Sequence, residues 1–580
     1  MNNFSANSLI KIKETIALVW RKHPFALPVA ALALWLIVFL LDQGVGFGLL
    51  VIAILSVLMF FFFWKYFTRE SLACYLFFVV LGIHVAAVLF IHYAQFQPFS
   101  GGIGDYTVYH QEARGVAEGL MRGDFSVLGG LPSSAPDLAV PHYYGRIIGV
   151  LYAFTLPKMV VGQLLGAWLG ALSSLLMYGV ARKLGFSKLW GFVVGLGISI
   201  YPSYLFYGSL LLRDVFVVPL VLGGIMLALA LFSKFSWKQF FLFYCIAAVL
   251  VMFMFYIGYA LIFAFLISWF SIAVSGFKKR ILLGGLFVLL LLGPLPEVSA
   301  NQGFFGWSSF KTYLNRNVIV FIREEAYVYQ EPSPAPISIS TPTPIPIPSS
   351  SLTPLPTSAV SSQTGRPLAT PIPLSSVPPV SFPVAISTPQ PTPQPTPQTT
   401  PQPTSLPATP SISVPPIVKR PFALEAPISI EGIALPASDP RRGEGSTVVV
   451  ETGLHSPVSF AVNSVKSFTH VFFGPFPWHV KYARHLFGLG ETALLYLMYP
   501  LIFFGIYAAI KKRKKEMLPL LVFSLMVLGV MTLYTASNFG VITRIRMPAI
   551  IILFAFLPLG WQFIWEFYKH KKEIHGRTTI

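Results

Sequence analysis

The chain has 580 residues, of which 55% are apolar and only 11% charged, and its mean hydropathy is +0.69. Soluble domains carry about 25% charged residues, so these values exclude an ordinary soluble protein. The formal net charge of +19 would suggest a nucleic-acid partner in a soluble chain. Apolar runs long enough to cross a hydrocarbon core about 30 Å thick recur here instead. We therefore expect an all-α polytopic membrane protein with no nucleic-acid partner.

Twelve apolar runs predict transmembrane helices: two in 25–71, seven in 72–297 and three in 488–568. The expected spans are 25–41, 46–64, 72–93, 159–180, 189–208, 214–232, 239–254, 257–275, 281–297, 488–510, 517–535 and 547–568. The run 239–275 carries no charge and is too long for one span, so we divide it at residues 256–258.

The distribution of lysine and arginine predicts the orientation of these spans. With the N-terminal segment 1–24 in the cytoplasm, twelve spans return the tail 569–580 to the same side, and the cytoplasmic side then holds 23 Lys and Arg residues. The short outer loops hold three, Arg213, Arg544 and Arg546. Because cytoplasmic loops are enriched in these residues, we expect a multi-pass protein of the cell membrane with both termini in the cytoplasm.

Two long segments then lie outside the membrane, 94–158 and 298–487. Within the second, residues 332–418 contain 26 prolines and one charged residue, Arg366. Such a stretch cannot bury a core and is typical of an extended, disordered Pro/Thr/Ser-rich linker. It divides the second segment into outer parts 298–331 and 419–487.

The first outer loop predicts a helix that begins at an aspartate. Glycines precede Asp105, and the apolar side chains after it recur at spacings of three and four, which places them on one helix face. These side chains are Tyr106, Tyr109, Ala113, Val116 and Leu120. An amphipathic helix of this kind lies in the membrane interface. Asp105 would then be held at headgroup level, either as a helix N-cap or as a catalytic carboxylate.

A second short apolar segment, 146–156, follows His142 and predicts another interfacial helix before the fourth span. His142 and Arg146 are the polar groups of this segment, and His142 is also explained as an interfacial side chain with its polar tip in water. Near the C-terminus, Arg544 and Arg546 precede the last span, where both anchoring and phosphate binding remain open.

These features resemble the membrane-embedded GT-C glycosyltransferases of the protein O-mannosyltransferase and aminoarabinose-transferase type. The similarity rests on Gly104-Asp105-Tyr106 with Tyr109, on Pro141-His142-Tyr143-Tyr144, and on Pro202 followed by Leu212-Arg213-Asp214. It covers about residues 72–297, the seven-span module of that superfamily. Two spans precede the module here, and the acidic pair of many O-mannosyltransferases is reduced to a single Asp105.

The resemblance implies a glycosyltransferase that moves a sugar from a polyprenyl-phosphate donor to an acceptor glycan, lipid or protein on the outer face. Asp105 would be the general base, and arginines would hold the phosphate. The candidate phosphate-binding residues are Arg213, Arg544, Arg546 and Arg146, and the candidate acceptor-binding or orienting residues are Tyr106, Tyr109, His142 and Asp214. We expect no cofactor and no bound metal, because no ligand set with suitable spacing is evident.

Three other functions remain open. An O-antigen or exopolysaccharide polymerase or ligase also has about twelve spans and outer arginines, but would not need Asp105. A lipid-linked saccharide transporter or flippase should show internal repeats and ionisable residues at mid-membrane, and His84 is the clearest such group. A scaffold would use the linker 332–418 to bind partners outside the membrane.

Overall fold

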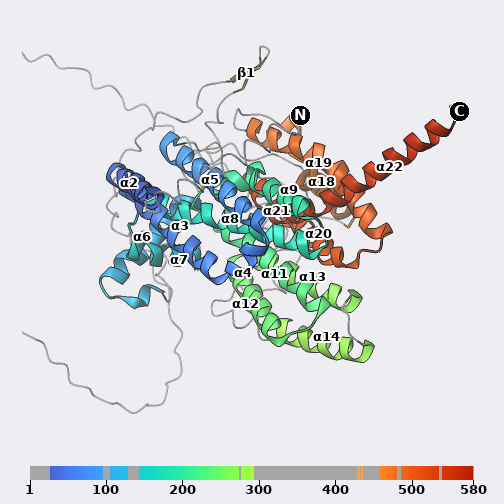
Figure 1. The fold of residues 1–580 in the computed structure, drawn as a ribbon, viewed down its shortest axis with the longest axis horizontal. Coiled ribbons are helices and arrows are strands. Elements are labelled where there is room, and N and C mark those ends of the chain that lie inside the picture. Colours follow the sequence, from blue (N-terminus) through green and yellow to red (C-terminus); the bar gives the residue numbers. More distant parts are fainter. Residues whose placement is uncertain are drawn as a thin grey trace, which may run out of the picture. The chain divides into compact units, whose positions relative to one another are not determined.

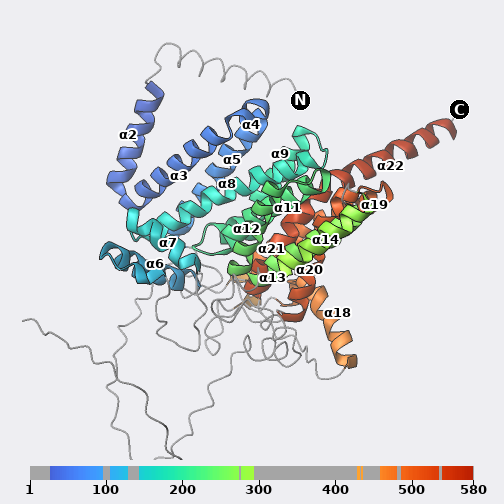
Figure 2. The same cartoon turned by 90° about the horizontal axis from the view of Figure 1, so that it is seen from below.

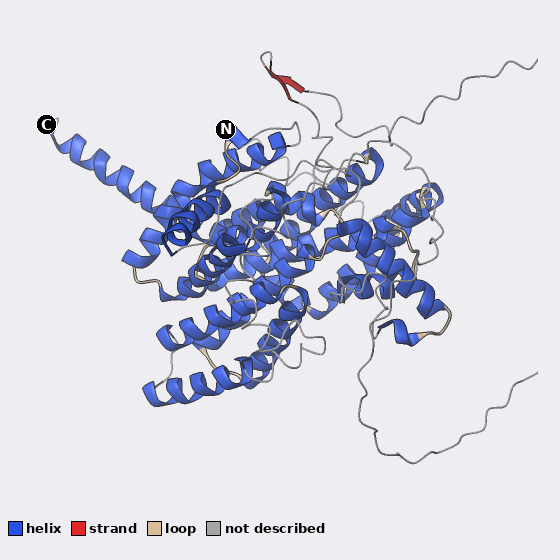
Figure 3. Ribbon diagram, turned by 180° about the vertical axis from the view of Figure 1, so that it is seen from behind, coloured by secondary structure: helices blue, strands red, loops and turns tan. Residues whose placement is uncertain are grey.

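The computed structural model describes residues 26–95, 105–128, 143–272, 276–292, 428–430, 433–435, 457–479, 485–534 and 539–578. Nearly all of these residues lie in helices, as Figures 1 and 3 show. The strands β1 (Ile428–Ile430) and β2 (Ile433–Leu435) form one antiparallel pair. The segments 1–24 and 298–331, the linker 332–418 and most of 419–487 lie outside the described residues.

The helices follow the predicted apolar runs along the whole chain. The first half contains α2 (Ala26–Leu41), α3 (Gln43–Phe62), α4 (Trp64–Arg69), α5 (Ser71–Ala94), α6 (Asp105–Met121), η1 (Phe125–Leu128), α7 (Tyr143–Phe154), α8 (Met159–Lys183), α9 (Lys188–Ser199), α10 (Pro202–Gly208), α11 (Asp214–Ser233), α12 (Trp237–Phe253), α13 (Phe255–Ile272) and α14 (Phe277–Leu292). The second half contains α18 (Pro457–Phe473), η3 (Pro477–His479), α19 (His485–Lys511), η4 (Lys515–Met517), α20 (Leu518–Tyr534), α21 (Phe539–Leu553), η5 (Phe554–Phe556) and α22 (Leu557–Thr578).

The described residues contain eight helices that are long and apolar enough to cross a membrane, or nine if one bent pair is a single span. The bent pair is α9 and α10, which meet at 60° where Pro202 begins the second helix. Two further apolar helices, residues 29–41 and α12, are shorter. The protein is therefore a multi-pass helical membrane protein. A helix lies at each of the twelve predicted runs, while the count of twelve spans stays a prediction.

The uninterrupted apolar run 239–275 is indeed two helices. The break lies at Met254, between α12 and α13, slightly before the predicted position at residues 256–258. The backbone N–H of Met254 still bonds to the carbonyl of Leu250 at 2.7 Å, so the first helix is closed before the second begins.

The helix predicted from Asp105 is present as α6, and the segment after it forms α7. Figure 2 shows the two helices side by side. Of the residues predicted on one face, Tyr106, Tyr109, Ala113 and Val116 are buried, and Leu120 is half-buried. Tyr109 meets Tyr144 of α7 edge-to-face at 5.1 Å between ring centroids, so this apolar face packs against protein and not only against lipid.

Helix α8 packs closely against its neighbours through small residues. Gly170 leaves room for the ring of His84, which is fully buried and edge-on to Tyr204 at 5.6 Å. Neither ring nitrogen of His84 has a hydrogen-bond partner among the described residues. His84 is therefore a packed side chain of the core that α5, α8 and α10 share.

Candidate active site

Three charged side chains from distant parts of the sequence meet in one cluster. Arg544 Nη1 lies 2.5 Å from Asp105 Oδ2, and Arg544 Nε lies 2.6 Å from Asp214 Oδ2. Both contacts are also hydrogen bonds, which join residues 439 and 330 positions apart. Because a guanidinium presents its donors in a fixed fork, one arginine holds both carboxylates in a defined arrangement. We call these three residues the Asp105–Arg544 cluster.

The cluster forms where three helices begin. Asp105 and Asp214 are the first residues of α6 and α11, and Arg544 lies in the second turn of α21. The unpaired N–H groups at a helix start carry partial positive charge and stabilise a carboxylate there. The two helix starts and Arg544 thus offset the charge of two nearby carboxylates.

Exposure differs strongly across the cluster. The Asp214 side chain is 3% exposed and the Arg544 side chain 15%, whereas the Asp105 side chain is 55% exposed. Asp214 is therefore the buried member of the cluster, and Arg544 is partly buried. Asp105 is the member that a reactant can reach.

Arg213 adds a second cation beside the cluster. It precedes Asp214 and is half-buried, and its charge acts on Tyr109 together with that of Arg544. In the described part of the chain its Nε is buried and has no hydrogen-bond partner. The neighbouring Asp214 accepts a hydrogen bond at Oδ2 from Arg544. Arg213 is thus a second guanidinium beside the cluster, with one buried donor that no described residue accepts.

The candidate acceptor-binding tyrosines lie in the first two turns of α6. Tyr106 and Tyr109 are each 3% exposed. Burial raises the pKa of Tyr109, although the nearby charges of Arg213 and Arg544 favour the phenolate. Both rings therefore support the position of α6, and neither presents an open surface to a substrate.

Arg146 lies in the α6–α7 pair and has contacts of its own. Its Nη1 donates to the Leu128 carbonyl at 3.0 Å, and its guanidinium lies 5.2 Å from the centroid of the Tyr143 ring. It also acts on Glu112, where burial raises the carboxyl pKa to about 7. His142, the other polar candidate of this segment, lies outside the described residues.

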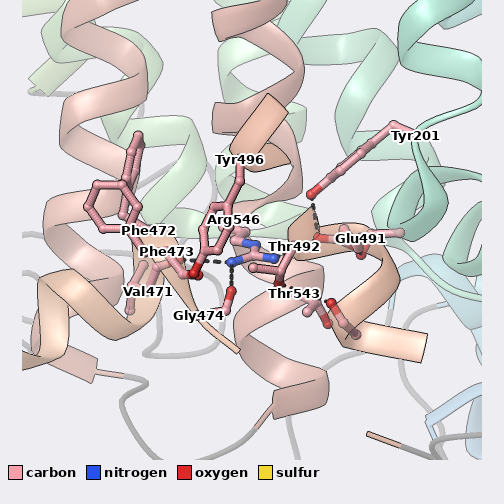
Figure 4. A network of polar contacts seen from close by, with 12 residues as sticks. Tyr201, Val471, Phe472, Phe473, Gly474, Glu491, Thr492, Tyr496, Thr543 and Arg546 are labelled. Carbon is pink, nitrogen blue, oxygen red and sulfur yellow. Dashed lines mark hydrogen bonds and ion pairs between the residues drawn. The ribbon is translucent and has the colours of Figure 1, made fainter. Parts of the chain in front are cut away.

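Arg546 lies in a separate polar network with Glu491 and Gly474, which Figure 4 shows. Its side chain is 0% exposed, and Nη2 lies 2.7 Å from Oε1 of Glu491, which is itself buried. Nη1 donates to the carbonyls of Gly474 and, at 3.2 Å, Val471. This arrangement favours a structural role for Arg546 over phosphate binding, because a buried charge needs such partners to remain in the core.

Glu491 is the centre of this network, and we did not select it from the sequence. Besides Arg546, it accepts hydrogen bonds from the hydroxyls of Tyr201, at 2.7 Å, and Ser203. We call these four residues the Glu491–Arg546 network. A signal was present, since Glu491 is the one acidic residue in the predicted span 488–510, and ionisable residues inside spans are usually paired.

Among the described residues, no group of three or more His, Cys, Asp or Glu side chains could hold a metal ion. The groups of the Asp105–Arg544 cluster itself are a carboxylate, which can accept a proton, and a guanidinium, which can bind anions. Comparison of the chain with protein-family models, with curated protein sequences and with solved structures found no match.

Proposed function

We propose that the protein is an integral membrane glycosyltransferase that moves a sugar from a polyprenyl-phosphate donor to the hydroxyl of an acceptor glycan, lipid or protein. The observation that carries this proposal is the Asp105–Arg544 cluster, an exposed carboxylate bound to a partly buried guanidinium. The resemblance of residues 72–297 to the GT-C seven-span module supports it, since that resemblance rests partly on Asp105, Arg213 and Asp214.

The reaction is a displacement at the anomeric carbon. The acceptor oxygen forms a bond to this carbon while the bond from the carbon to the phosphate oxygen breaks, and its electron pair leaves with the polyprenyl phosphate. Asp105 accepts the proton of the acceptor hydroxyl. Its 55% exposed side chain can be reached by that hydroxyl.

The two arginines have different roles in this proposal. Arg544 binds Asp105 and Asp214 together, so it positions the base. Arg213 binds the departing phosphate, because a guanidinium pairs well with phosphate oxygens. The cluster itself has two carboxylates and one guanidinium, and Arg213 brings a second positive charge to balance them.

The twelve-span topology belongs to the same proposal. With both termini in the cytoplasm, 23 Lys and Arg residues lie on the cytoplasmic side and three in short outer loops. The Asp105–Arg544 cluster then lies at the outer face of the cell membrane. A lipid-linked donor reaches this level by diffusion in the membrane, so the site needs no nucleotide-binding domain.

Replacement of the base tests the mechanism. Asp105→Asn should lower sugar transfer by a factor of about 10²–10⁴, the usual contribution of a positioned base, while leaving the amount of folded protein unchanged. The measurement is transfer of radiolabelled mannose from polyprenyl-phosphate mannose in proteoliposomes, with a polyprenyl-phosphate pentose as the second donor. Asp124→Asn is the matched control, because Asp124 is exposed, lies after α6 and, among the described residues, its side chain bonds to nearby Ser126.

The same assay separates the alternatives. Arg213→Ala should raise the donor concentration needed for half-maximal rate, and an unchanged requirement would exclude Arg213 from phosphate binding. Full transfer by Asp105→Asn combined with loss in Arg213→Ala would favour a polymerase or ligase. Movement of the lipid-linked sugar across the liposome membrane without any transfer product would favour a flippase.

A further inference from the structure

A groove lies between α19 and α20, beside the lysine-rich turn that joins them. Its volume is about 240 Å³. Ile506 and Ile510 of α19 form one wall, Leu518 and Leu521 of α20 form the other, and Phe556 of η5 also lines it. The lining is thus apolar, and its two main walls belong to helices of membrane-spanning length and composition.

Three cations line the same groove, Arg513, Lys514 and Lys515. Within the described ranges none of them forms an ion pair, whereas the neighbouring Lys512 binds Glu566 at 3.0 Å. Lys514 Nζ lies 5.4 Å from the ring centroid of Phe186, which belongs to the turn between α8 and α9. This turn is flanked by lysines of its own, Lys183 and Lys188. Positive charge at the groove therefore has no protein counter-charge within ion-pair distance in the described part of the chain.

The backbone at Arg513 supports a function for its charge. Arg513 has φ +50, and the N–H of Lys514 bonds to the Ala509 carbonyl at 2.9 Å, the pattern of a helix that ends in a left-handed residue. Glycine is the usual residue at this position, because a side chain there is strained. The chain instead places an arginine at a position where glycine would be more stable.

We propose that this groove binds an anionic phospholipid, with its phosphate on Arg513, Lys514 and Lys515 and the start of an acyl chain between Ile506 and Leu521. A phospholipid has the same arrangement, a charged headgroup directly joined to apolar chains. Basic pockets between membrane helices bind anionic headgroups on the same principle. Free phosphate would use the cations alone and leave the aliphatic walls exposed.

The test uses the purified full-length protein in neutral detergent and measures the thermal shift and the lipids retained in native mass spectrometry. Phosphatidylglycerol should raise the melting temperature at low micromolar concentration. Phosphatidylcholine with the same acyl chains, and inorganic phosphate, should not. An equal shift with phosphatidylcholine, or a full shift with inorganic phosphate, would overturn the proposal.

Three variants separate binding from folding. Arg513→Gly should keep or raise the melting temperature without lipid, since it relieves the left-handed strain. It should also raise at least several-fold the phosphatidylglycerol concentration that gives half of the thermal shift. The variant that combines Arg513→Gln, Lys514→Gln and Lys515→Gln should need more than tenfold more phosphatidylglycerol for the same thermal shift. Ile506→Trp fills the groove, keeps the cations and should also weaken binding.

The matched control removes the same charge elsewhere. Combined Lys569→Gln, Lys571→Gln and Lys572→Gln on α22 should leave the phosphatidylglycerol response unchanged. If this control weakens binding as much as the groove variants do, lipid binding depends on the net charge of the protein and not on the groove, and the proposal fails. Unchanged binding in Arg513→Gly or in Ile506→Trp would overturn it as well.

Discussion

Arg544 and Arg546 lie two residues apart on α21 and serve different neighbours. Two residues turn a helix by about 200°, so the two side chains leave α21 on nearly opposite faces. Arg544 binds Asp105 and Asp214, whereas Arg546 binds Glu491. The rotation of α21 about its axis is therefore held from both sides, and the Glu491–Arg546 network indirectly sets the position of Arg544.

This division predicts the effect of neutralising the buried pair. Glu491→Gln leaves the charge of Arg546 buried without a counter-ion and should destabilise the protein by about 3–5 kcal/mol. Adding Arg546→Gln restores a neutral hydrogen-bonding pair and should recover most of the loss, measured as melting temperature in detergent. The double variant should retain sugar transfer. A stable double variant that needs more donor for the half-maximal rate would instead assign Arg546 to the donor phosphate.

Glu112 predicts a pH dependence of stability. It lies on α6, outside the spanning helices, and burial against α7 raises its pKa from 4.5 to about 7, although Arg146 opposes this. Between these values the folded protein holds a proton that the unfolded chain has released. Its contribution to stability is therefore full below about pH 4.5, falls as the pH rises to about 7 and is constant above.

Glu112→Gln removes this titration. Compared with the wild type, the variant should gain melting temperature at pH 8 relative to pH 5, in thermal unfolding measured in one detergent. Glu118→Gln is the matched control, because Glu118 lies on the same helix with its side chain 44% exposed. Its ion pairs within the described ranges are with nearby Arg114 and Arg122. A gain of the same size in the control would show that α6 charge in general, and not burial of Glu112, causes the effect.

At the scale of elements, local patterns predicted most of the helices. Apolar length predicted the runs that became α3, α5 and α8, and the three-and-four spacing after Asp105 predicted α6 and its buried face. The sequence also indicated two interruptions. The run 239–275 is too long for one helix, which predicted the break near Met254, and Pro202 marks the bend between α9 and α10. What local patterns do not contain is which helices touch, because those contacts join residues hundreds of positions apart.

The contact between α19 and α22 illustrates such unpredicted packing. A Cβ at Gly560 would lie 1.9 Å from the backbone carbonyl oxygen of Leu501, so these helices approach backbone to backbone. Gly560→Ala must push them apart and should cost about 1–3 kcal/mol, the usual range for overpacking. Thermal unfolding measures the loss. Gly529→Ala on α20 is the control, since no atom lies within 4 Å of its Cβ position, and an equal loss there would contradict the packing argument.

At the scale of the whole molecule, the sequence identified the three charged residues of the cluster. It did not predict that they contact one another. Asp105, Asp214 and Arg544 were each selected from a local motif or from the scarcity of arginine in short outer loops. The sequence could not separate Arg544 from Arg546, because both precede the predicted last span and were expected in one short outer loop. The structure places both inside α21, and their difference depends on which helices pack around it. Glu491 was missed for a related reason, since its importance comes from Tyr201 and Ser203 in the other half of the chain.

The two halves of the chain thus contact each other directly through the Asp105–Arg544 cluster, the Glu491–Arg546 network and the packing of α13 on α20. These contacts do not involve the linker 332–418, whose 26 prolines and single charge cannot supply a core.

We therefore expect that a Gly/Ser sequence of the same length can replace residues 332–418 with little effect on melting temperature or on sugar transfer. Thermal unfolding and the proteoliposome assay measure both. Deletion of α18 is the matched control, because Val471 in this helix accepts a hydrogen bond from Arg546, and it should abolish folding. Normal folding with loss of transfer in the Gly/Ser variant would show that the linker takes part in acceptor binding, and loss of a protein partner alone would favour the scaffold function.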